Sequence, residues 1–76
     1  MVHAYVMVVT AAGSTQAVLS QVLDIDGVTE AHVIAGAYDL VIEMDSENVT
    51  NLLDAVSSEL GNVEGVGTTR TYIALA

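Results

Sequence analysis

Two strand–helix–strand units follow one another in this chain, and that order restricts the fold more than any other feature of the sequence. The triplets Asp26-Gly27-Val28 and Glu64-Gly65-Val66 occupy equivalent places in the two units, each between a predicted helix and the strand that follows it. A glycine in such a place marks a turn. The repeated pattern indicates a weak internal duplication.

Each predicted strand has a pattern of its own. Residues 2–10 (VHAYVMVVT) are dense in β-branched side chains and predict a strand that is largely apolar on both faces. Residues 39–45 (DLVIEMD) alternate, so Leu40, Ile42 and Met44 are expected to face inward. Two further strands are predicted at 29–35 and 68–75.

Both predicted helices carry an apolar stripe. Ser14 or Thr15 is expected to cap the first helix, and Asp45 or Ser46 the second, while Gly61 is expected to end the second. The stripes consist of Val18, Leu19, Val22 and Leu23 in the first helix, and of Val49, Leu52, Leu53, Val56 and Leu60 in the second.

This order of elements predicts one domain, residues 1–76, with a ferredoxin-like α+β fold. In this split βαβ arrangement (β-α-β-β-α-β), a four-stranded antiparallel sheet carries both helices on one face. The rule that crossover connections are right-handed leaves few other topologies. Nothing in the chain then remains to cover the second face of the sheet.

The apolar content of the chain predicts self-association. Apolar residues make up 53% of only 76 residues, which is more than one small core can bury. At about 25 cal/mol per Å², burying a few hundred Å² of exposed sheet surface contributes several kcal/mol. A dimer that pairs the uncovered sheet faces is therefore expected as the smallest stable unit.

The charge of the chain excludes several partners. The chain has ten Asp and Glu residues and a single arginine, Arg70, so its net charge is −9. Such a surface repels the phosphates of nucleic acids and anionic membranes, so neither direct DNA binding nor membrane binding is expected. No segment approaches the about 20 apolar residues of a membrane span, and no signal peptide is seen, so a cytoplasmic location is expected. The absence of lysine suggests a halophilic source, where salt screens the repulsion among carboxylates.

The corner from Gly36 to Asp39 (GAYD) is the clearest candidate for a binding site. Gly36 tolerates the positive φ of a hairpin corner, and Asp39 places a carboxylate beside strand-end amides. A small ligand with an ammonium or hydroxyl group fits such a corner if another element closes over it. The alternative is a plain turn in which Asp39 accepts local backbone hydrogen bonds.

The remaining polar residues give little support for catalysis or metal binding. His3 and His32 lie in predicted strands without the spacing of a metal site, so a solvated or interface role is favoured. Arg70 has two interpretations: it clamps a ligand carboxylate, or it neutralises Glu43 or Glu30 across the sheet. No cysteine, nucleophile motif or phosphate loop is present.

Taken together, the chain resembles the effector-binding (RAM) domain of the Lrp/AsnC family of feast/famine transcription regulators. The resemblance covers nearly all of the chain, in the right order. Family members carry a helix-turn-helix before this domain, whereas this chain begins at the first strand, so it resembles the stand-alone version. The matching residues are Ala4-Tyr5-Val6, the two turns at 26–28 and 64–66, the corner at 36–39 followed by Leu40, and Thr69-Arg70-Thr71.

The resemblance implies a binding site and an assembly. Domains of this family dimerise through their sheets, the dimers assemble into rings, and amino acids bind where dimers meet. By resemblance, Gly36, Tyr38 and Asp39 would border that pocket, and Thr69 and Thr71 would contact the ligand from the last strand. Asp39 would meet the ligand's ammonium group or order the amides around it. No cofactor is implied.

Three functions remain in competition at this point. The leading hypothesis is an amino-acid-binding assembly module that acts on transcription indirectly, by self-assembly or by co-assembly with a full-length Lrp-type regulator. The second is a small dimeric oxygenase, for which His3 is the only candidate residue. The third is a purely structural heterodimer partner.

Overall fold

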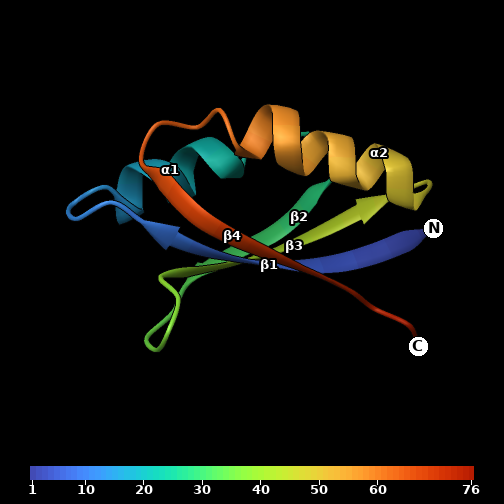
Figure 1. Cartoon of the computed structure of the whole chain (residues 1–76), viewed down its shortest axis with the longest axis horizontal. Helices are drawn as coiled ribbons and strands as arrows, with labels where there is room; N and C mark the ends of the chain where they lie inside the picture. The colour runs from blue at the N-terminus through green and yellow to red at the C-terminus, as the bar shows by residue number, and fades with distance from the viewer.

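A computed structural model describes all residues from Met1 to Ala76. Four antiparallel strands form one sheet in the order β2-β3-β1-β4, and both helices lie on one face of it (Figure 1). The predicted ferredoxin-like α+β fold is confirmed. The elements are β1 (Val2–Thr10), α1 (Thr15–Val22), β2 (Val28–Val33), β3 (Leu40–Ser46), α2 (Val49–Asp54), the π-helical segment η1 (Ala55–Leu60) and β4 (Val66–Ile73).

The duplicated turns have the same geometry in both halves. Val28 N–H donates to Ile25 O, and Val66 N–H donates to Val63 O, each over 3.2 Å. Gly27 has a φ of 94° and Gly65 a φ of 97°. A turn closed in this way needs a positive φ at its third residue, which favours glycine. The two triplets are therefore equivalent in structure as well as in sequence.

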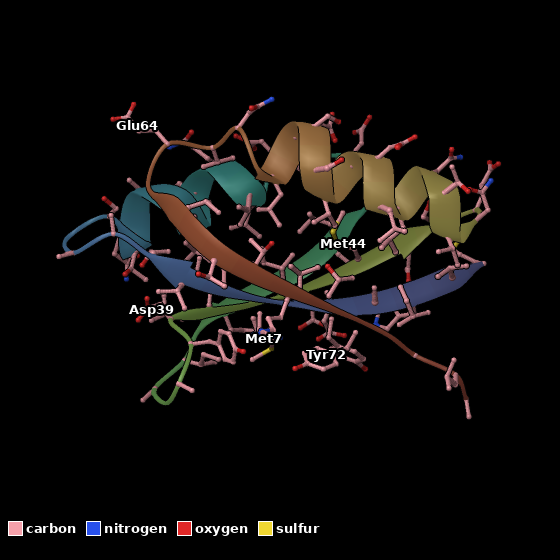
Figure 2. All side chains as sticks on the ribbon, viewed as in Figure 1. Met7, Asp39, Met44, Glu64 and Tyr72 are labelled. Carbon is pink, nitrogen blue, oxygen red and sulfur yellow. The ribbon has the colours of Figure 1, made fainter.

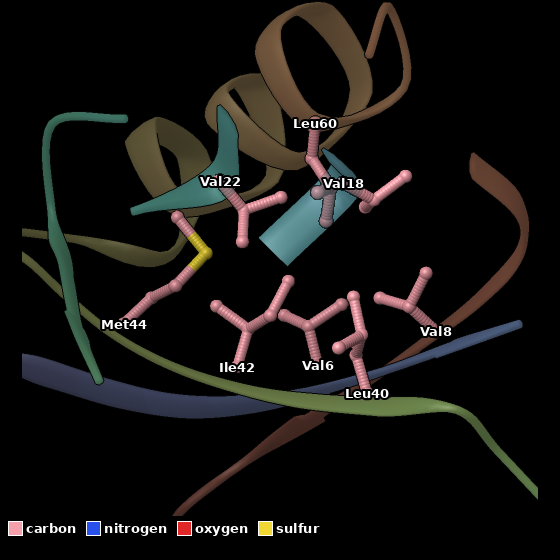
Figure 3. Close-up of a cluster of buried hydrophobic side chains, with 8 residues drawn as sticks. All are labelled: Val6, Val8, Val18, Val22, Leu40, Ile42, Met44 and Leu60. Atoms are coloured by element: carbon pink, nitrogen blue, oxygen red, sulfur yellow. The ribbon is translucent and has the colours of Figure 1, made fainter. Parts of the chain in front are cut away.

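The core lies between the sheet and the helices (Figure 3). The inward residues of β3 are buried as predicted, with exposed fractions of at most 2%. Dense packing of this kind stabilises a small domain mainly by removing apolar surface from water. The central cluster consists of Val6, Val8, Val18, Val22, Leu40, Ile42, Met44 and Leu60.

The second helix begins later than predicted. Asp45 and Ser46 extend β3, where they pair with His3 and Val2 of β1, so neither caps the helix. The cap is Asn48, whose side-chain oxygen accepts a hydrogen bond from Asn51 N–H at 2.8 Å. Sheet pairing with β1 therefore decides where β3 ends.

The apolar stripes are only partly buried. Val18 and Val22 of the first stripe are fully buried, but Leu23, Val49 and Leu53 are 43–50% exposed. In the second helix the reason is a change to π-helical hydrogen bonding after Asp54, for example from Gly61 N–H to Val56 O at 2.9 Å. A π segment shifts the phase of the helix, so a stripe spaced for an α-helix does not stay on one face.

The strand bounds also differ from the predicted ones. Strand β2 spans Val28–Val33 rather than 29–35, and the hydrogen bond from Ile34 N–H to Asp39 O at 3.0 Å is the last one before the chain enters the corner. Strand β4 spans Val66–Ile73 rather than 68–75, because pairing with β1 begins with Val66 opposite Thr10, past an irregularity between Val8 and Thr10.

Candidate functional site

The corner between β2 and β3 projects beyond the sheet, on the side away from the helices (Figure 1). Gly36 has a positive φ of 155°, as predicted. A side chain added at Gly36 would meet no other atom within 4 Å, so the space around this residue is open. Tyr38 and Asp39, by contrast, are partly buried where the corner rejoins the sheet.

The carboxylate of Asp39 holds the end of β1. Its Oδ2 accepts a hydrogen bond from Thr10 N–H at 2.8 Å and lies 3.2 Å from the Thr10 hydroxyl oxygen. The Asp39 N–H donates to Val8 O at 2.9 Å. These contacts reach the neighbouring strand, so Asp39 orders an amide at the end of β1 rather than groups within its own turn.

Thr69 and Thr71 lie on the other side of β1 from the corner. They pair with Val8 and Val6, whose side chains are fully buried beneath the helices. Because cross-strand partners share a face, both threonines are on the helix-bearing face of the sheet. Asp39 and Thr69 flank Val8 from opposite sides, about 10 Å apart at two strand spacings.

The five predicted site residues therefore do not form one pocket within a single chain. The corner that carries Gly36 and Tyr38 projects on the open side of the sheet, whereas Thr69 and Thr71 lie on the helix-bearing face of the edge strand β4. The isolated chain has no pocket of ligand size. A site that uses both groups needs a surface from outside this chain.

The open face of the sheet carries aromatic and apolar side chains. Met7 and Tyr72 lie on the side away from the helices (Figure 2). Tyr5 and Tyr72 are directly paired across β1 and β4 and are 41% and 55% exposed. As predicted, no element of the chain covers this face.

Ionisable groups occupy the β1–β3 part of the same face. The His3 imidazole lies between two carboxylates of β3: Nδ1 is hydrogen-bonded to Asp45, and Nε2 lies 3.1 Å from Glu43 Oε1. The hydrogen bonds to Asp45 and then to Glu43 raise the pKa of His3 above its usual value, while partial burial opposes them. Sequence reasoning missed this cluster, although the alternation of β1 and β3 placed all three residues on one face.

Arg70 does not neutralise Glu43 or Glu30. It pairs with Met7 in the β1–β4 register, and β1 separates β4 from β3. The nearest basic side chains to the two glutamates are His3, for Glu43, and His32, for Glu30, and each carries a charge only when it is protonated. The predicted ion pair was wrong because it required β4 to lie next to β3 or β2.

Comparison with known proteins decides the family. The model of the Lrp/AsnC ligand-binding domain matches residues 3–76. This chain belongs to that family. An uncharacterized HTH-type transcriptional regulator of Pyrococcus abyssi is 36% identical over 57 residues, which cover 75% of this Lrp/AsnC domain and 38% of the regulator. The chain therefore spans well under half of the curated relatives it matches.

Solved structures agree with the assignment. The crystal structure of FFRP-DM1 has a TM-score of 0.93 at 31% identity, over 99% of this chain and all of that one. TTHA0845 from Thermus thermophilus has a TM-score of 0.95 at 29% identity, and the match covers 100% of this chain and 95% of that one. The L-Met complex of the regulator NMB0573 from Neisseria meningitidis has a TM-score of 0.88, and the match covers 99% of this chain and 50% of that one. At 16% identity this match shows only that the fold is shared.

The family assignment narrows the function. Lrp/AsnC domains are regulatory ligand-binding domains and not enzymes, which confirms the prediction against catalysis and removes the oxygenase alternative. None of the helices in this Lrp/AsnC domain is long and apolar enough to cross a membrane.

Proposed function

We propose that this domain binds a free amino acid between copies of itself and thereby tunes its own assembly. The observation that carries the proposal is the match to the Lrp/AsnC ligand-binding domain over residues 3–76. A ligand that binds only the assembled form shifts the equilibrium toward that form by mass action. Its effect on transcription is then indirect, through self-assembly or co-assembly with a full-length regulator.

The uncovered sheet face supports a homodimer. Two partly exposed tyrosines and Met7 lie there beside partly buried Val9 and Val41. Contiguous exposed apolar surface of this kind marks an interaction site. Pairing two such faces buries this surface without any further element, so a dimer is the proposed basic unit, and dimers are proposed to assemble further into a ring.

The proposed ligand site lies where dimers meet. The single chain has no pocket, and the projecting corner is open around Gly36, so a neighbouring copy is needed to close it. In this proposal Gly36 and Tyr38 border the ligand, and Asp39 orders the backbone around it through Thr10. Thr69 and Thr71 contribute hydroxyl groups from the last strand. The L-Met complex of a protein with the same fold is consistent with an amino acid as ligand.

The chemistry of the surface argues against direct DNA binding by this domain. Its net charge of −9 opposes contact with phosphates, which supply most of the affinity of DNA-binding proteins. A regulator that co-assembles with this domain would supply the DNA contacts. Such a co-assembly places the domain in the cytoplasm.

Calorimetric titration with each of the twenty amino acids, in molar KCl, tests the proposal. At least one is expected to release or absorb heat and to change the assembly size in light scattering. Thr69→Val is expected to weaken that binding, because it removes a hydroxyl without changing the shape of the side chain. Thr29→Val on the exposed edge strand β2 is the matched control. If none of the twenty amino acids gives a heat of binding while the assembly stays intact, a structural role as a heterodimer partner becomes the better explanation.

A further inference from the structure

Three metal-ligating side chains converge on the open face near the β2 edge. Glu30 and His32 lie on β2, and Glu43 lies opposite Glu30 on β3. One ligand atom from each of the three lies within 4.8 Å of the other two, and His32 Nε2 is 3.1 Å from Glu30 Oε1. Two adjacent strands thus bring one imidazole and two carboxylates together, although the sequence spacing predicted no metal site.

The two carboxylates form an unfavourable pair without a cation. Glu30 and Glu43 are directly paired in the β2–β3 register, and like charges at such positions destabilise the pairing of strands. The only arginine, Arg70, lies on β4, beyond β1, and the chain has no lysine. A divalent cation between the two carboxylates would convert this repulsion into attraction.

Glu43 is also held from the side opposite His32. His3 Nε2 lies 3.1 Å from Glu43 Oε1, and the side chain of Glu43 is 25% exposed, against 57% for Glu30 and 58% for His32. A ligating carboxylate that is hydrogen-bonded by a residue outside the ligand set is the usual way in which proteins orient a metal ligand. His3 is therefore a positioning residue, itself fixed by Asp45.

We propose that Glu30, His32 and Glu43 bind a divalent transition-metal ion of the Zn²⁺ class. Imidazole and carboxylate together suit zinc, nickel, cobalt or copper, whereas Mg²⁺ and Ca²⁺ sites are built from oxygen ligands. Three protein ligands leave coordination positions open to water or another group. All three residues belong to one chain, so the site does not depend on the proposed amino-acid binding.

Titration of the metal-free protein with ZnCl₂, after dialysis against EDTA, tests the site by calorimetry. His32→Gln and Glu43→Gln are each expected to weaken Zn²⁺ binding by a factor of at least about 10, because the loss of a residue that only orients a ligand already costs about 10–100-fold. Glu64→Gln is the matched control, because it removes the same charge from an exposed loop residue outside the cluster. It is expected to leave the affinity unchanged within about twofold, because charges beyond a Debye length of about 10 Å are largely screened.

Cobalt supplies a second readout that reports the ligands directly. Co²⁺ bound to the native protein is expected to show visible absorption bands, which His32→Gln abolishes and Glu64→Gln preserves. His3→Gln is expected to weaken Zn²⁺ binding while keeping the Co²⁺ bands, because His3 orients a ligand without being one. Equal loss of affinity in Glu43→Gln and Glu64→Gln, or a Co²⁺ spectrum unaffected by His32→Gln, would show only diffuse attraction to an acidic surface and would overturn the assignment. Circular dichroism of each variant verifies that it is folded.

Discussion

Asp39 and Thr10 lie 29 residues apart in sequence, and the carboxylate of the first accepts a 2.8 Å hydrogen bond from the backbone amide of the second. Thr10 is only 9% exposed, so its amide has little access to water. The Thr10 hydroxyl also lies 2.7 Å from that of Thr15, at the start of α1. One carboxylate thus connects the β2–β3 corner, the end of β1 and the beginning of the first helix.

Asp39→Ala is expected to destabilise the domain by about 1–3 kcal/mol, the cost of a buried donor left without its partner. Chemical denaturation followed by circular dichroism measures the change. Asp26→Ala is the control, because Asp26 is exposed in a turn and its carboxylate accepts no hydrogen bond from the rest of the chain. Equal losses in the two variants would mean that the Asp39–Thr10 bond adds nothing to stability.

Alanine is expected to destabilise the domain more at Gly27 than at Gly13. Both glycines have positive φ, 94° and 79°, so alanine is strained at either. At Gly27 the added Cβ would also lie 2.9 Å from the backbone oxygen of Asp45, whereas at Gly13 it meets nothing within 4 Å. Overpacking of this kind costs about 1–3 kcal/mol. Thermal unfolding of Gly27→Ala and Gly13→Ala should therefore differ by that amount, and similar midpoints would contradict the clash.

His3 is expected to make stability depend on pH. Its pKa in the folded state is raised above the ordinary 6.5, first by the hydrogen bond to Asp45 and then by that to Glu43. These two carboxylates alone account for the rise: Tyr5 packs its ring edge-on against the imidazole, with 5.1 Å between the ring centroids, and strand β4 contributes only the Ala74 amide to the His3 carbonyl. A group with a raised folded-state pKa stabilises the fold fully below its unfolded value and loses this contribution as pH rises through the raised value.

The measurement is the free energy of unfolding from pH 5 to 9, in a buffer with EDTA so that no metal competes for Glu43. Stability should fall as pH rises above about 6.5, the ordinary histidine value, and His3→Gln should flatten this part of the profile. His32→Gln, which replaces the other histidine, should leave this part of the profile unchanged. A nuclear magnetic resonance titration midpoint for His3 at or below 6.5 would contradict the raised pKa.

The fold could be predicted because its evidence is local. The alternation of Leu40, Ile42 and Met44 and the repeated glycine turns need no knowledge of distant contacts. Errors arose where distant contacts decide. Asn48 replaces Asp45 and Ser46 as helix cap because β1 extends β3, and Leu53 is exposed because the helix changes to π-type bonding after Asp54.

The candidate site depended even more on distant contacts. The sequence identified Asp39, but its partner Thr10 became clear only once β1 was placed beside β3. The face on which Thr69 and Thr71 lie depends on their register with β1, past an irregularity. For Arg70 on β4, the strand order alone excluded Glu43 on β3 and Glu30 on β2 as partners. Residue types can therefore suggest the chemistry of a site, whereas pairing register determines which groups meet.

Tyr72→Asp is expected to weaken the proposed sheet-to-sheet dimer by about tenfold or more, which corresponds to 1.4 kcal/mol. The substitution removes an exposed aromatic side chain from the open face and adds a charge there. Leu53→Asp is the matched control, because Leu53 is similarly exposed, at 48% against 55%, but lies on α2 across the sheet. Light scattering over a dilution series gives the dissociation constants. A dimer weakened only by Leu53→Asp would place the interface on the helices.

Salt is expected to stabilise this domain strongly. The ten carboxylates, offset by only one arginine, repel one another at low ionic strength. At 1 M salt the Debye length falls to about 3 Å, which screens charges that are not in contact. The melting temperature should therefore rise steadily between low and molar KCl. A triple variant, Asp54→Lys, Glu59→Lys and Glu64→Lys, replaces three exposed acids by cations and should melt higher in low salt with a weaker dependence on KCl. Because the variant has the same core, an equal salt dependence in both proteins would assign the effect to apolar burial. A melting temperature of the native protein that does not change with KCl would remove the case for a halophilic source.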